Sequence, residues 1–352
     1  MNIYTPEGWL DFVKIDNFAV KHNISFIMID GGRATGKTFG AVDLVLIDKP
    51  CKFIWLRRTL VQLELINKPE LNPFKKNYKE GHIPFEPAMQ NISKYNAGVY
   101  VGEVDEEGRL IATGAPLGYT AALSTFSNIR GFDASDVDVV IFDEFIPERT
   151  ERPIKDEFGA FCNAYETINR NRELDGKPPL RCYCLANSND IGNPLYVGFG
   201  LVKTRLNMRR SGENVHIDQK RGIMLVALDD SPISREKEDT ALYRATRGSS
   251  FYDMSINNIF DGENDIRSVS RPLREYKPVV GVGELTVYKH KGNKLPLYCT
   301  FHRSGSPVLY GSSDTELERF AKKYAWLWLA YMENRIEFEE YAAELLFQRY
   351  FK

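Results

Sequence analysis

The chain contains few cysteines, five among 352 residues, and their number is odd. Four of the five stand in apolar, strand-like runs or beside aromatic residues, a setting typical of reduced thiols in a protein core. Cys182 and Cys184 are two residues apart and have no His or Cys pair near them, which argues against a zinc site. We therefore expect a cytosolic protein with reduced thiols.

Long apolar runs and an excess of charge of either sign are also missing. No stretch approaches the roughly 18 to 20 apolar residues of a membrane span, so no membrane partner is expected. The N-terminal stretch MNIYTPEGWLDFVKIDNFAV has neither the basic start nor the long apolar core of a secretory signal. The 46 basic and 48 acidic residues leave a net charge of −2. This excludes a globally basic nucleic-acid binder but permits a local basic strip inside a ring or groove.

Hydrophobic residues make up 43% of the chain and aromatic residues 12%, which predicts well-buried cores rather than disorder. A chain of this length is expected to form two domains. In the first half, strand-like and helix-like segments alternate, which indicates an α/β fold with a mostly parallel sheet flanked by helices. The expected strands lie at 24–29, 51–56, 137–142 and 182–185, a helix at 39–47 and a hairpin at 99–112.

The pattern changes after about residue 205. A basic region at 203–221 lies next to another expected strand at 223–228, and a polar, charge-rich stretch follows. From 279 onward the sequence predicts antiparallel strands and then two helices, near 314–334 and 336–350. We therefore expect a first domain at 1–205, a linker subdomain at 206–265 and a smaller α+β domain at 266–352. The helically spaced Phe320, Tyr324, Trp328 and Tyr331 indicate core packing.

Residues 31–38, GGRATGKT, fit the pattern G-x-x-x-x-G-K-[ST] at every fixed position. Gly31 and Gly36 permit the tight backbone path that turns successive N–H groups onto phosphate oxygens. Lys37 supplies a point charge to the β and γ phosphates, and the Thr38 hydroxyl can ligate Mg²⁺. The alternative is an ordinary glycine-rich turn, but the apolar strand before it and the helix after it favour a site for ATP. The residues expected to contact the nucleotide here are Gly31, Gly32, Arg33, Ala34, Thr35, Gly36, Lys37 and Thr38.

A second group of candidate residues is the stretch 137–144, VDVVIFDE, in which a buried strand delivers two adjacent carboxylates to its carboxyl end. We expect Asp143 to hold Mg²⁺ through water. Glu144 would orient and polarise an attacking water, which gives hydrolysis rather than transfer to a second substrate. The alternative is that the two acids cap the next helix. Behind an intact phosphate loop the catalytic interpretation is favoured, and the Asp-Glu pair indicates a hydrolysing motor over a GTPase switch or a kinase.

Three further positions have both a functional and a structural interpretation. Arg170, in INRNRE, could stabilise negative charge on a γ phosphate, often from a neighbouring subunit, or it could end a solvated helix. Arg130, in SNIRG before the acidic strand, has the same ambiguity. Asn187 ends the strand CYCLAN, where it could sense the γ phosphate or simply favour a turn.

Taken together, GGRATGKT, the arginine pair after CKFIWLRR, VVIFDEFI, NRNRE and RCYCLANS resemble the DNA-packaging ATPases of small tailed phages of the phi29 type. The resemblance continues more weakly through SSFYDMSINNIF at 249–260 to the last helices. The phosphate loop and the Asp-Glu pair occur in many ATPases. FDEF followed by RNRE and CLAN at these separations is much more specific.

The resemblance implies an ASCE-type P-loop NTPase that, with ATP and Mg²⁺, drives double-stranded DNA into a prohead. It implies a homo-oligomeric ring, a pentamer, in the host cytoplasm and transiently at the portal vertex, with a packaging RNA as a further possible partner. It also implies that Arg170 acts in trans as an arginine finger and that Arg130 lies near the intersubunit ATP site. The C-terminal domain would be a vestigial RNase H-like nuclease fold. Its strands carry Glu284 and little other acid, so nuclease activity is not expected.

Two other functions compete with a packaging motor. A helicase or other replication ATPase would share the site and separate the strands of a fork. A non-catalytic portal or capsid adaptor with a decayed P-loop is disfavoured, because every reactive position is intact. DNA contact in the motor would be electrostatic and independent of sequence, with Lys76, Lys79 and residues 203–210 as weak candidates.

Overall fold

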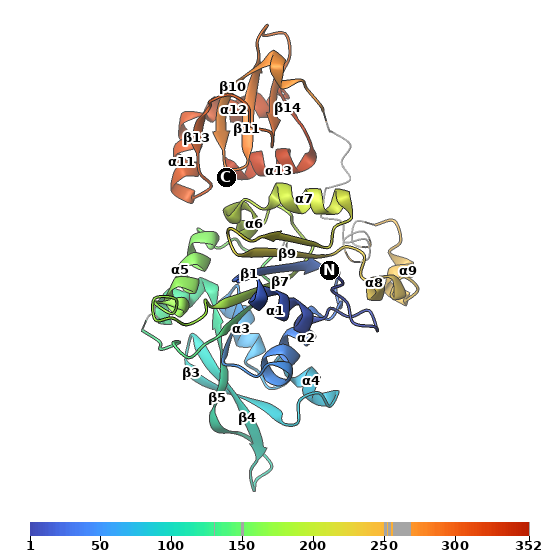
Figure 1. The fold of residues 1–352 in the computed structure, drawn as a ribbon, viewed down its shortest axis with the longest axis vertical. Helices are drawn as coiled ribbons and strands as arrows, with labels where there is room; N and C mark the ends of the chain where they lie inside the picture. Colours follow the sequence, from blue (N-terminus) through green and yellow to red (C-terminus); the bar gives the residue numbers. More distant parts are fainter. Residues whose placement is uncertain (130, 149–150, 250–251, 253–254, 256–268, 352) are drawn as a thin grey trace.

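Two β-sheets organise the chain into a large N-terminal domain and a smaller C-terminal domain (Figure 1). The structure is a computed structural model that describes residues 1–129, 131–148, 151–249, 252, 255 and 269–351. The larger sheet has nine strands in the order β3-β4-β5-β2-β6-β7-β1-β9-β8, and the smaller has five in the order β13-β10-β11-β12-β14. Among the described residues, no helix has the length and apolar character needed to cross a bilayer.

The centre of the large sheet is parallel and its edges are antiparallel. Strands β5, β2, β6, β7, β1 and β9 run parallel, while β3 and β4 on one edge and β8 on the other run against their neighbours. The expected, mostly parallel α/β sheet therefore forms the core of a larger mixed sheet. Its strands are β1 (Phe26–Gly31), β2 (Phe53–Arg57), β3 (Glu86–Ser93), β4 (Asn96–Val104), β5 (Leu110–Ala122), β6 (Val139–Asp143), β7 (Arg181–Asn187), β8 (Val215–Asp218) and β9 (Ile223–Leu228).

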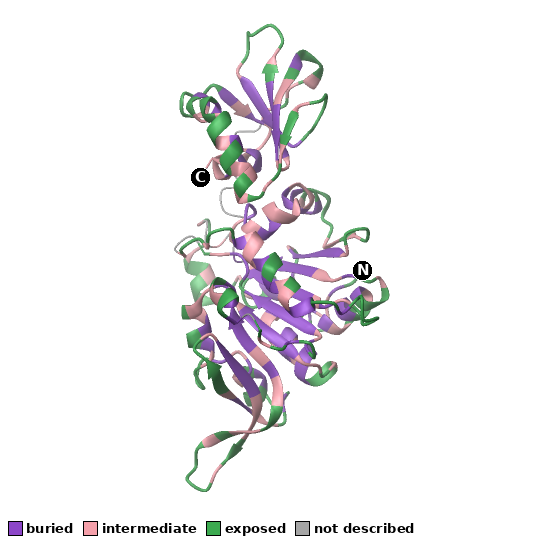
Figure 2. Cartoon of the chain, turned by 90° about the vertical axis from the view of Figure 1, so that its left-hand side faces the viewer, coloured by how far each residue is buried: buried purple, intermediate pink, exposed green. Residues whose placement is uncertain are grey.

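The central strands are buried on both faces, because helices cover each side of the sheet (Figure 2). Alternate residues point to opposite faces, so Met28 of β1 joins one core while Ile27 and Ile29 join the other. The second core contains residues of α1 (Phe12–Lys21), α2 (Lys37–Asp43) with the π-helical turn Leu44–Asp48, and α3 (Leu60–Ile66); α4 (Lys75–Lys79) packs beside α2. The first core contains residues of α5 (Glu157–Asn169), α6 (Pro194–Phe199) and α7 (Val202–Ser211), with the 3₁₀ turn Leu123–Ile129.

The expected hairpin at 99–112 is present and longer, since β4 pairs with β5 from Val104↔Leu110 back to Asn96↔Ala121. It projects from the body of the domain, and its outer part is exposed (Figure 2). The expected boundary between the first domain and the linker, at 205/206, falls inside α7. It also separates β9 from the large sheet, although β9 pairs with β1 there. The segment that leaves this sheet therefore begins after β9, with α8 (Pro232–Glu236) and α9 (Ala241–Ala245).

The C-terminal domain begins with three antiparallel strands, β10 (Tyr276–Val282), β11 (Leu285–His290) and β12 (Leu297–Thr300), after a 3₁₀ turn at Leu273–Glu275. Strand β13 (Val308–Tyr310) pairs in parallel with β10. The single helix expected at 314–334 is instead two, α11 (Asp314–Lys323) and α12 (Ala325–Met332), interrupted at Tyr324. The helix expected at 336–350 begins later, as α13 (Tyr341–Tyr350), because 336–338 form strand β14 (Ile336–Phe338) against β12.

Helix α7 lies between the large sheet and the C-terminal domain (Figure 1). Both carboxylate oxygens of Glu284 accept hydrogen bonds from the backbone N–H groups of Val202 and Lys203, at 3.2 and 3.1 Å, at the start of α7. Arg210 in its last turn forms an ion pair with Glu340. The apolar core of the first domain continues into the second at this interface, so the two domains form one packed unit around α7.

Candidate functional site

The phosphate loop connects the buried end of β1 to the start of α2. Gly31 lies beside β9, where a Cβ atom would stand 2.4 Å from the Cβ of Leu228, so glycine is required there. Gly36 has a φ of +90° and begins α2 as its N-cap. Between them Ala34 has a φ of +55°, which is costly for a residue with a side chain. Residues 31–36 therefore form a tight loop between β1 and α2, and contacts with neighbouring elements keep its backbone in this conformation.

Lys37 folds over this loop. Its ammonium group donates to the carbonyl oxygens of Gly31 and Gly32 at 3.1 and 2.7 Å and to the Thr35 hydroxyl at 3.3 Å. A fourth contact, at 3.4 Å, joins it to the side-chain oxygen of Asn187 at the end of β7. Burial lowers the pKa of Lys37 to about 8. A phosphate group at the loop would supply the anion that this buried ammonium lacks.

Asp143 ends β6, which is separated from β1 by β7, and it faces the first turn of α2. The Thr38 hydroxyl lies 3.3 Å from a carboxylate oxygen of Asp143. Burial raises the pKa of Asp143, and the nearby Arg57 opposes that shift. A hydroxyl and a carboxylate at this separation form a pair of hard oxygen donors, the ligand type that Mg²⁺ takes.

Glu144 follows Asp143 with a φ of +60°, in the left-handed region, and its side chain is 49% exposed. This turn directs Glu144 into the same cavity that Lys37 and Thr38 line. Backbone strain in a non-glycine residue is common where a side chain must be held at a functional site. From this position Glu144 could orient a water molecule for attack on the terminal phosphate of a bound nucleotide.

Arg57 is a site residue that the sequence pattern did not reveal in this role. Its guanidinium lies 3.0 Å from Asp143 and 3.1 Å from Glu144 and so joins the two carboxylates. The register of the parallel strands β2 and β6 explains this position of Arg57. Leu56 of β2 pairs with Phe142 of β6, and the residues that follow them are Arg57 and Asp143. Arg58 points to the opposite face, where it is fully buried against Glu157. The only signal in the sequence was an arginine pair directly after a buried strand.

A cavity of about 750 Å³ opens over the phosphate loop. Lys37, Thr38, Asp143, Glu144 and Asn187 line its inner end. Other parts of its wall carry aromatic side chains from the N-terminal segment, α2 and the turn after α4, namely Trp9, Phe39 and His82. The cavity therefore offers positive charge for a triphosphate and oxygen ligands for a Mg²⁺ ion. It also offers flat surfaces on which a base can stack.

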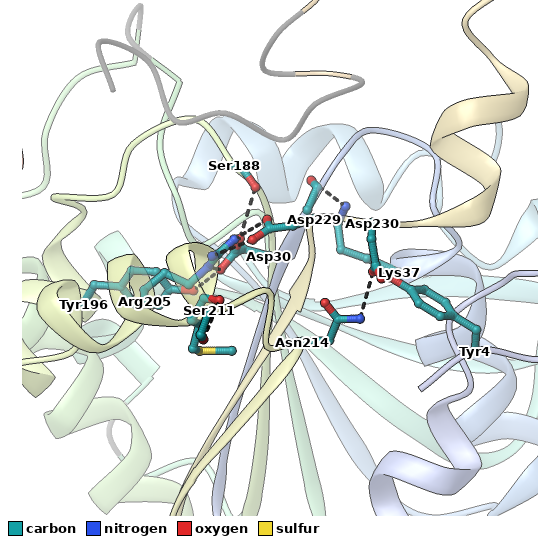
Figure 3. Close-up of polar contacts among 12 residues, drawn as sticks. Tyr4, Asp30, Lys37, Ser188, Tyr196, Arg205, Ser211, Asn214, Asp229 and Asp230 are labelled. Carbon is teal, nitrogen blue, oxygen red and sulfur yellow. Dashed lines mark hydrogen bonds and ion pairs between the residues drawn. The ribbon is translucent and has the colours of Figure 1, made fainter. Parts of the chain in front are cut away.

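Arg33 projects from the phosphate loop toward the segment after β6, where it forms an exposed ion pair with Glu148 at 2.5 Å. Asp30, directly before the loop, is buried and held on the other face of the sheet. Arg205 of α7 makes a bidentate contact to Asp30 at 2.8 and 2.7 Å and also reaches Asp229 (Figure 3). The hydroxyls of Ser188 and Tyr196 complete the shell around Asp30. This network anchors the base of the phosphate loop to α6, α7 and the end of β9.

Arg170, the expected arginine finger, is not among the residues that line this cavity. Arg170, the C-cap of α5, has a φ of +46°, is 43% exposed, and donates to the carbonyl oxygen of Phe132 at 2.9 Å. Arg172 is instead buried, and it binds the carbonyl oxygen of Val137 at 2.6 Å and Asp138 at 2.7 Å, which gives it a structural role. Arg130 and most of the stretch 249–260 lie outside the described residues. Arg170 also lies 3.6 Å from a carboxylate oxygen of Asp133, in an exposed ion pair.

The sheet and the phosphate loop define a mixed α/β protein of the P-loop type. Residues 16–283 match the family described as Podovirus DNA encapsidation protein (Gp16). This match covers more than half of the chain, and the chain belongs to that family. The family resemblance found in the sequence motifs is thereby confirmed.

Individual relatives agree with this membership. The chain is 28% identical over 269 residues to the DNA packaging protein of Bacillus phage phi29, a match that covers 75% of this chain and 67% of that protein. It is 28% identical over 206 residues to the DNA packaging protein of Bacillus phage B103, covering 55% and 60%.

Two solved structures share the fold over nearly the whole chain. The Phi-28 gp11 DNA packaging motor matches with a TM-score of 0.61 and 16% identity, covering 99% of this chain and 97% of that one. The bacteriophage Phi-29 viral genome packaging motor assembly matches with a TM-score of 0.56 and 18% identity, covering 99% and 100%. Both domains of the chain therefore belong to the shared fold.

Proposed function

We propose that the chain is the ATP-driven motor that moves double-stranded viral DNA into a prohead, acting as a ring at the portal vertex. The observation that carries this proposal is the meeting of Lys37 and Thr38 with Asp143 and Glu144 at one end of the parallel strands, in a member of a DNA encapsidation family. Relatives named as packaging proteins and packaging motors support the same role. The chain keeps the residue types that this chemistry needs, namely Lys37 and Thr38 in the phosphate loop and Asp143 and Glu144 after β6.

The chemistry assigned to the site is hydrolysis of the γ phosphate of ATP. The loop N–H groups and Lys37 would bind the phosphates, and Thr38 and Asp143 would hold Mg²⁺, which would neutralise phosphate charge. Glu144 orients the attacking water and accepts its proton. Arg57 lies 3.0 Å from Asp143 and 3.1 Å from Glu144, so it holds both carboxylates beside the phosphate loop. Asn187, at the end of the strand between β1 and β6, is placed to contact the γ phosphate.

We assign the first domain to the ASCE class of P-loop ATPases. Its support is the extra strand β7 between the phosphate-loop strand and the acidic strand, and the glutamate directly after Asp143. The C-terminal domain is assigned as a reduced RNase H-like fold that no longer cuts DNA. Three antiparallel strands followed by a parallel one beside the first support that fold. Glu284, the acid singled out there, instead receives the N–H groups of α7.

ATP hydrolysis measured alone, with duplex DNA, and with duplex DNA plus proheads tests this function. We expect the highest turnover with DNA and proheads together, accompanied by DNA that becomes protected from nuclease. A helicase would instead separate the strands of a forked substrate without proheads. An adaptor with a decayed P-loop would show no hydrolysis under any condition. Either of these results would overturn the proposal.

Arg170→Ala is expected to lower the turnover of assembled rings by about 10³-fold or more, the effect of losing an arginine finger. Arg170 lies outside its own subunit's cavity and is exposed, so we assign it to the site of the neighbouring subunit. Mixed rings supply the test. A subunit with Arg170→Ala keeps Glu144, and a subunit with Glu144→Gln keeps Arg170, so some mixed interfaces regain a complete site.

Lys177→Ala, which removes an exposed positive charge from the loop after α5, is the matched control and should retain full turnover. Recovery of hydrolysis on mixing the two inactive subunits supports action in trans. If Arg170→Ala subunits keep normal turnover, or if no mixture recovers activity, the assignment of Arg170 is wrong.

A further inference from the structure

A lysine from outside the P-loop motif holds the phosphate loop. Lys237, the C-cap of α8, donates from its ammonium group to the carbonyl oxygens of Arg33 and Ala34, at 2.6 and 2.7 Å. It is separated from these residues by about 200 positions in the sequence and belongs to the segment that leaves the large sheet after β9. No spacing rule within the P-loop motif predicts such a partner.

The two carbonyl groups belong to the part of the loop whose conformation is least favourable. Ala34 has a φ of +55°, so its neighbouring peptide groups would not keep this orientation without support. In a planar trans peptide the C=O and the following N–H point in opposite directions. When Lys237 holds the oxygens of Arg33 and Ala34, the N–H groups of Ala34 and Thr35 are therefore directed to the opposite side. Inward-pointing N–H groups of this kind are what bind phosphate in a P-loop.

The position of Lys237 is itself fixed by packing. In α8, Ile233 and Ser234 are buried. Pro232 packs closely against Gly8, because a Cβ atom added to Gly8 would stand 2.9 Å from the Cβ of Pro232. The segment starts from the end of β9, where Asp230 accepts hydrogen bonds from Tyr4 and Asn214 at 3.0 and 2.8 Å (Figure 3). Lys237 thus reaches the loop from a short helix that is anchored on the N-terminal segment and on the last strand of the sheet.

We propose that Lys237 is a positioning residue for the triphosphate of ATP, supplied by the segment between the two domains. It fixes two N–H donors of the phosphate loop and adds positive charge beside Lys37. A displacement of this segment would then weaken the grip on the phosphates, which links nucleotide affinity to the connection between the domains. The inference rests on the proposed ATP site, but it concerns binding alone and is independent of DNA movement.

The test compares Lys237→Met with Lys237→Arg in the full-length protein without DNA. Dissociation constants are measured by displacement of a fluorescent ATP analogue with ATPγS, AMP and inorganic tripolyphosphate, each with Mg²⁺. For Lys237→Met we expect ATPγS and tripolyphosphate to bind about tenfold more weakly, the scale of one lost charged hydrogen-bonding group. AMP should bind nearly as before, and Lys237→Arg should restore most of the affinity for ATPγS.

Lys220→Met is the matched control, because Lys220 is an exposed lysine of the β8–β9 turn and its loss removes the same charge. It should leave all three affinities unchanged. Thermal unfolding of each variant shows whether it is folded. The proposal is overturned if folded Lys237→Met binds ATPγS as the wild type does, or if AMP loses as much affinity as tripolyphosphate. Failure of the wild type to bind any of the three would instead overturn the ATP site itself, whereas absence of DNA packaging leaves this inference standing.

Discussion

Glu144→Gln is expected to leave ATP binding intact while lowering ATP turnover by about 10²–10⁴-fold, the contribution of a well-placed general base. The substitution keeps the shape of the side chain and removes the oxygen that accepts a proton from water. The phosphate-binding groups Lys37 and Thr38 are untouched. Binding is measured with a fluorescent ATP analogue, and turnover is measured as phosphate release by assembled rings with DNA.

Glu64→Gln provides the control for this experiment. Glu64 is an exposed residue of α3 in the same domain, so the same change of charge occurs away from the cavity. It should alter neither binding nor turnover. Normal phosphate release by Glu144→Gln would remove Glu144 from the catalytic site. A loss of binding equal to the loss of turnover would indicate that Glu144 holds the nucleotide rather than activating water.

The sequence predicted the inner end of this site because its parts are local. GGRATGKT has a fixed spacing between loop glycines, lysine and threonine, and VVIFDE places its acids directly after a buried strand. Parallel strands bring their carboxyl ends to one edge of the sheet, so the meeting of Thr38 and Asp143 follows from the fold class alone. The strand at 223–228 was also predicted, but its place beside β1 was not, since sequence pattern does not give strand order.

Arg57 and Lys237 could not be predicted in the same way. Arg57 and Arg58 are neighbours with the same side chain, and only the strand register decides that one faces Asp143 and the other Glu157. Lys237 follows a helix of five residues whose position depends on contacts with the N-terminal segment. The break at Tyr324 was missed for a related reason, because aromatic residues at helical spacing continue across it. For Arg57 and Lys237 a tertiary contact decided the outcome.

Arg205→Met is expected to lower the free energy of unfolding by about 3–5 kcal/mol, the cost of breaking a buried ion pair on one side. Arg205 and Asp30 are almost fully buried, with side-chain exposures of 0% and 1%. Without the guanidinium, Asp30 keeps only the hydroxyls of Ser188 and Tyr196 as side-chain partners within the described part of the chain, and Asp229 is left nearby with the same charge. Urea denaturation followed by tryptophan fluorescence, to which the buried Trp55 contributes, measures the loss.

Arg210→Met is the matched control on the same helix. Arg210 pairs with Glu340 across the domain interface, and the exposed fractions of the two side chains are 59% and 13%. An ion pair whose arginine lies largely in solvent contributes less than a fully buried one, so this variant should lose less stability than Arg205→Met. Equal losses for Arg205→Met and Arg210→Met would contradict the importance of burial, and a loss below about 1 kcal/mol for Arg205→Met would contradict the network itself.

The pH dependence of the same variant separates lost charge pairing from lost packing. In the wild type, burial acts to raise the pKa of Asp30, but Arg205 outweighs it and holds that pKa below its ordinary value. A carboxyl with a lowered folded-state pKa stabilises the protein above its unfolded pKa of about 3.9, and this stability is lost as the pH falls through the folded value. In Arg205→Met, nothing outweighs the effect of burial on the pKa of Asp30, so this carboxyl can take up a proton and become neutral.

The difference in stability between the wild type and Arg205→Met should therefore shrink as the pH falls from 7 toward about 4.5. A difference that stays constant over this range would assign the loss to the packing of the arginine side chain, and the charge on Asp30 would then play no part in anchoring the phosphate loop.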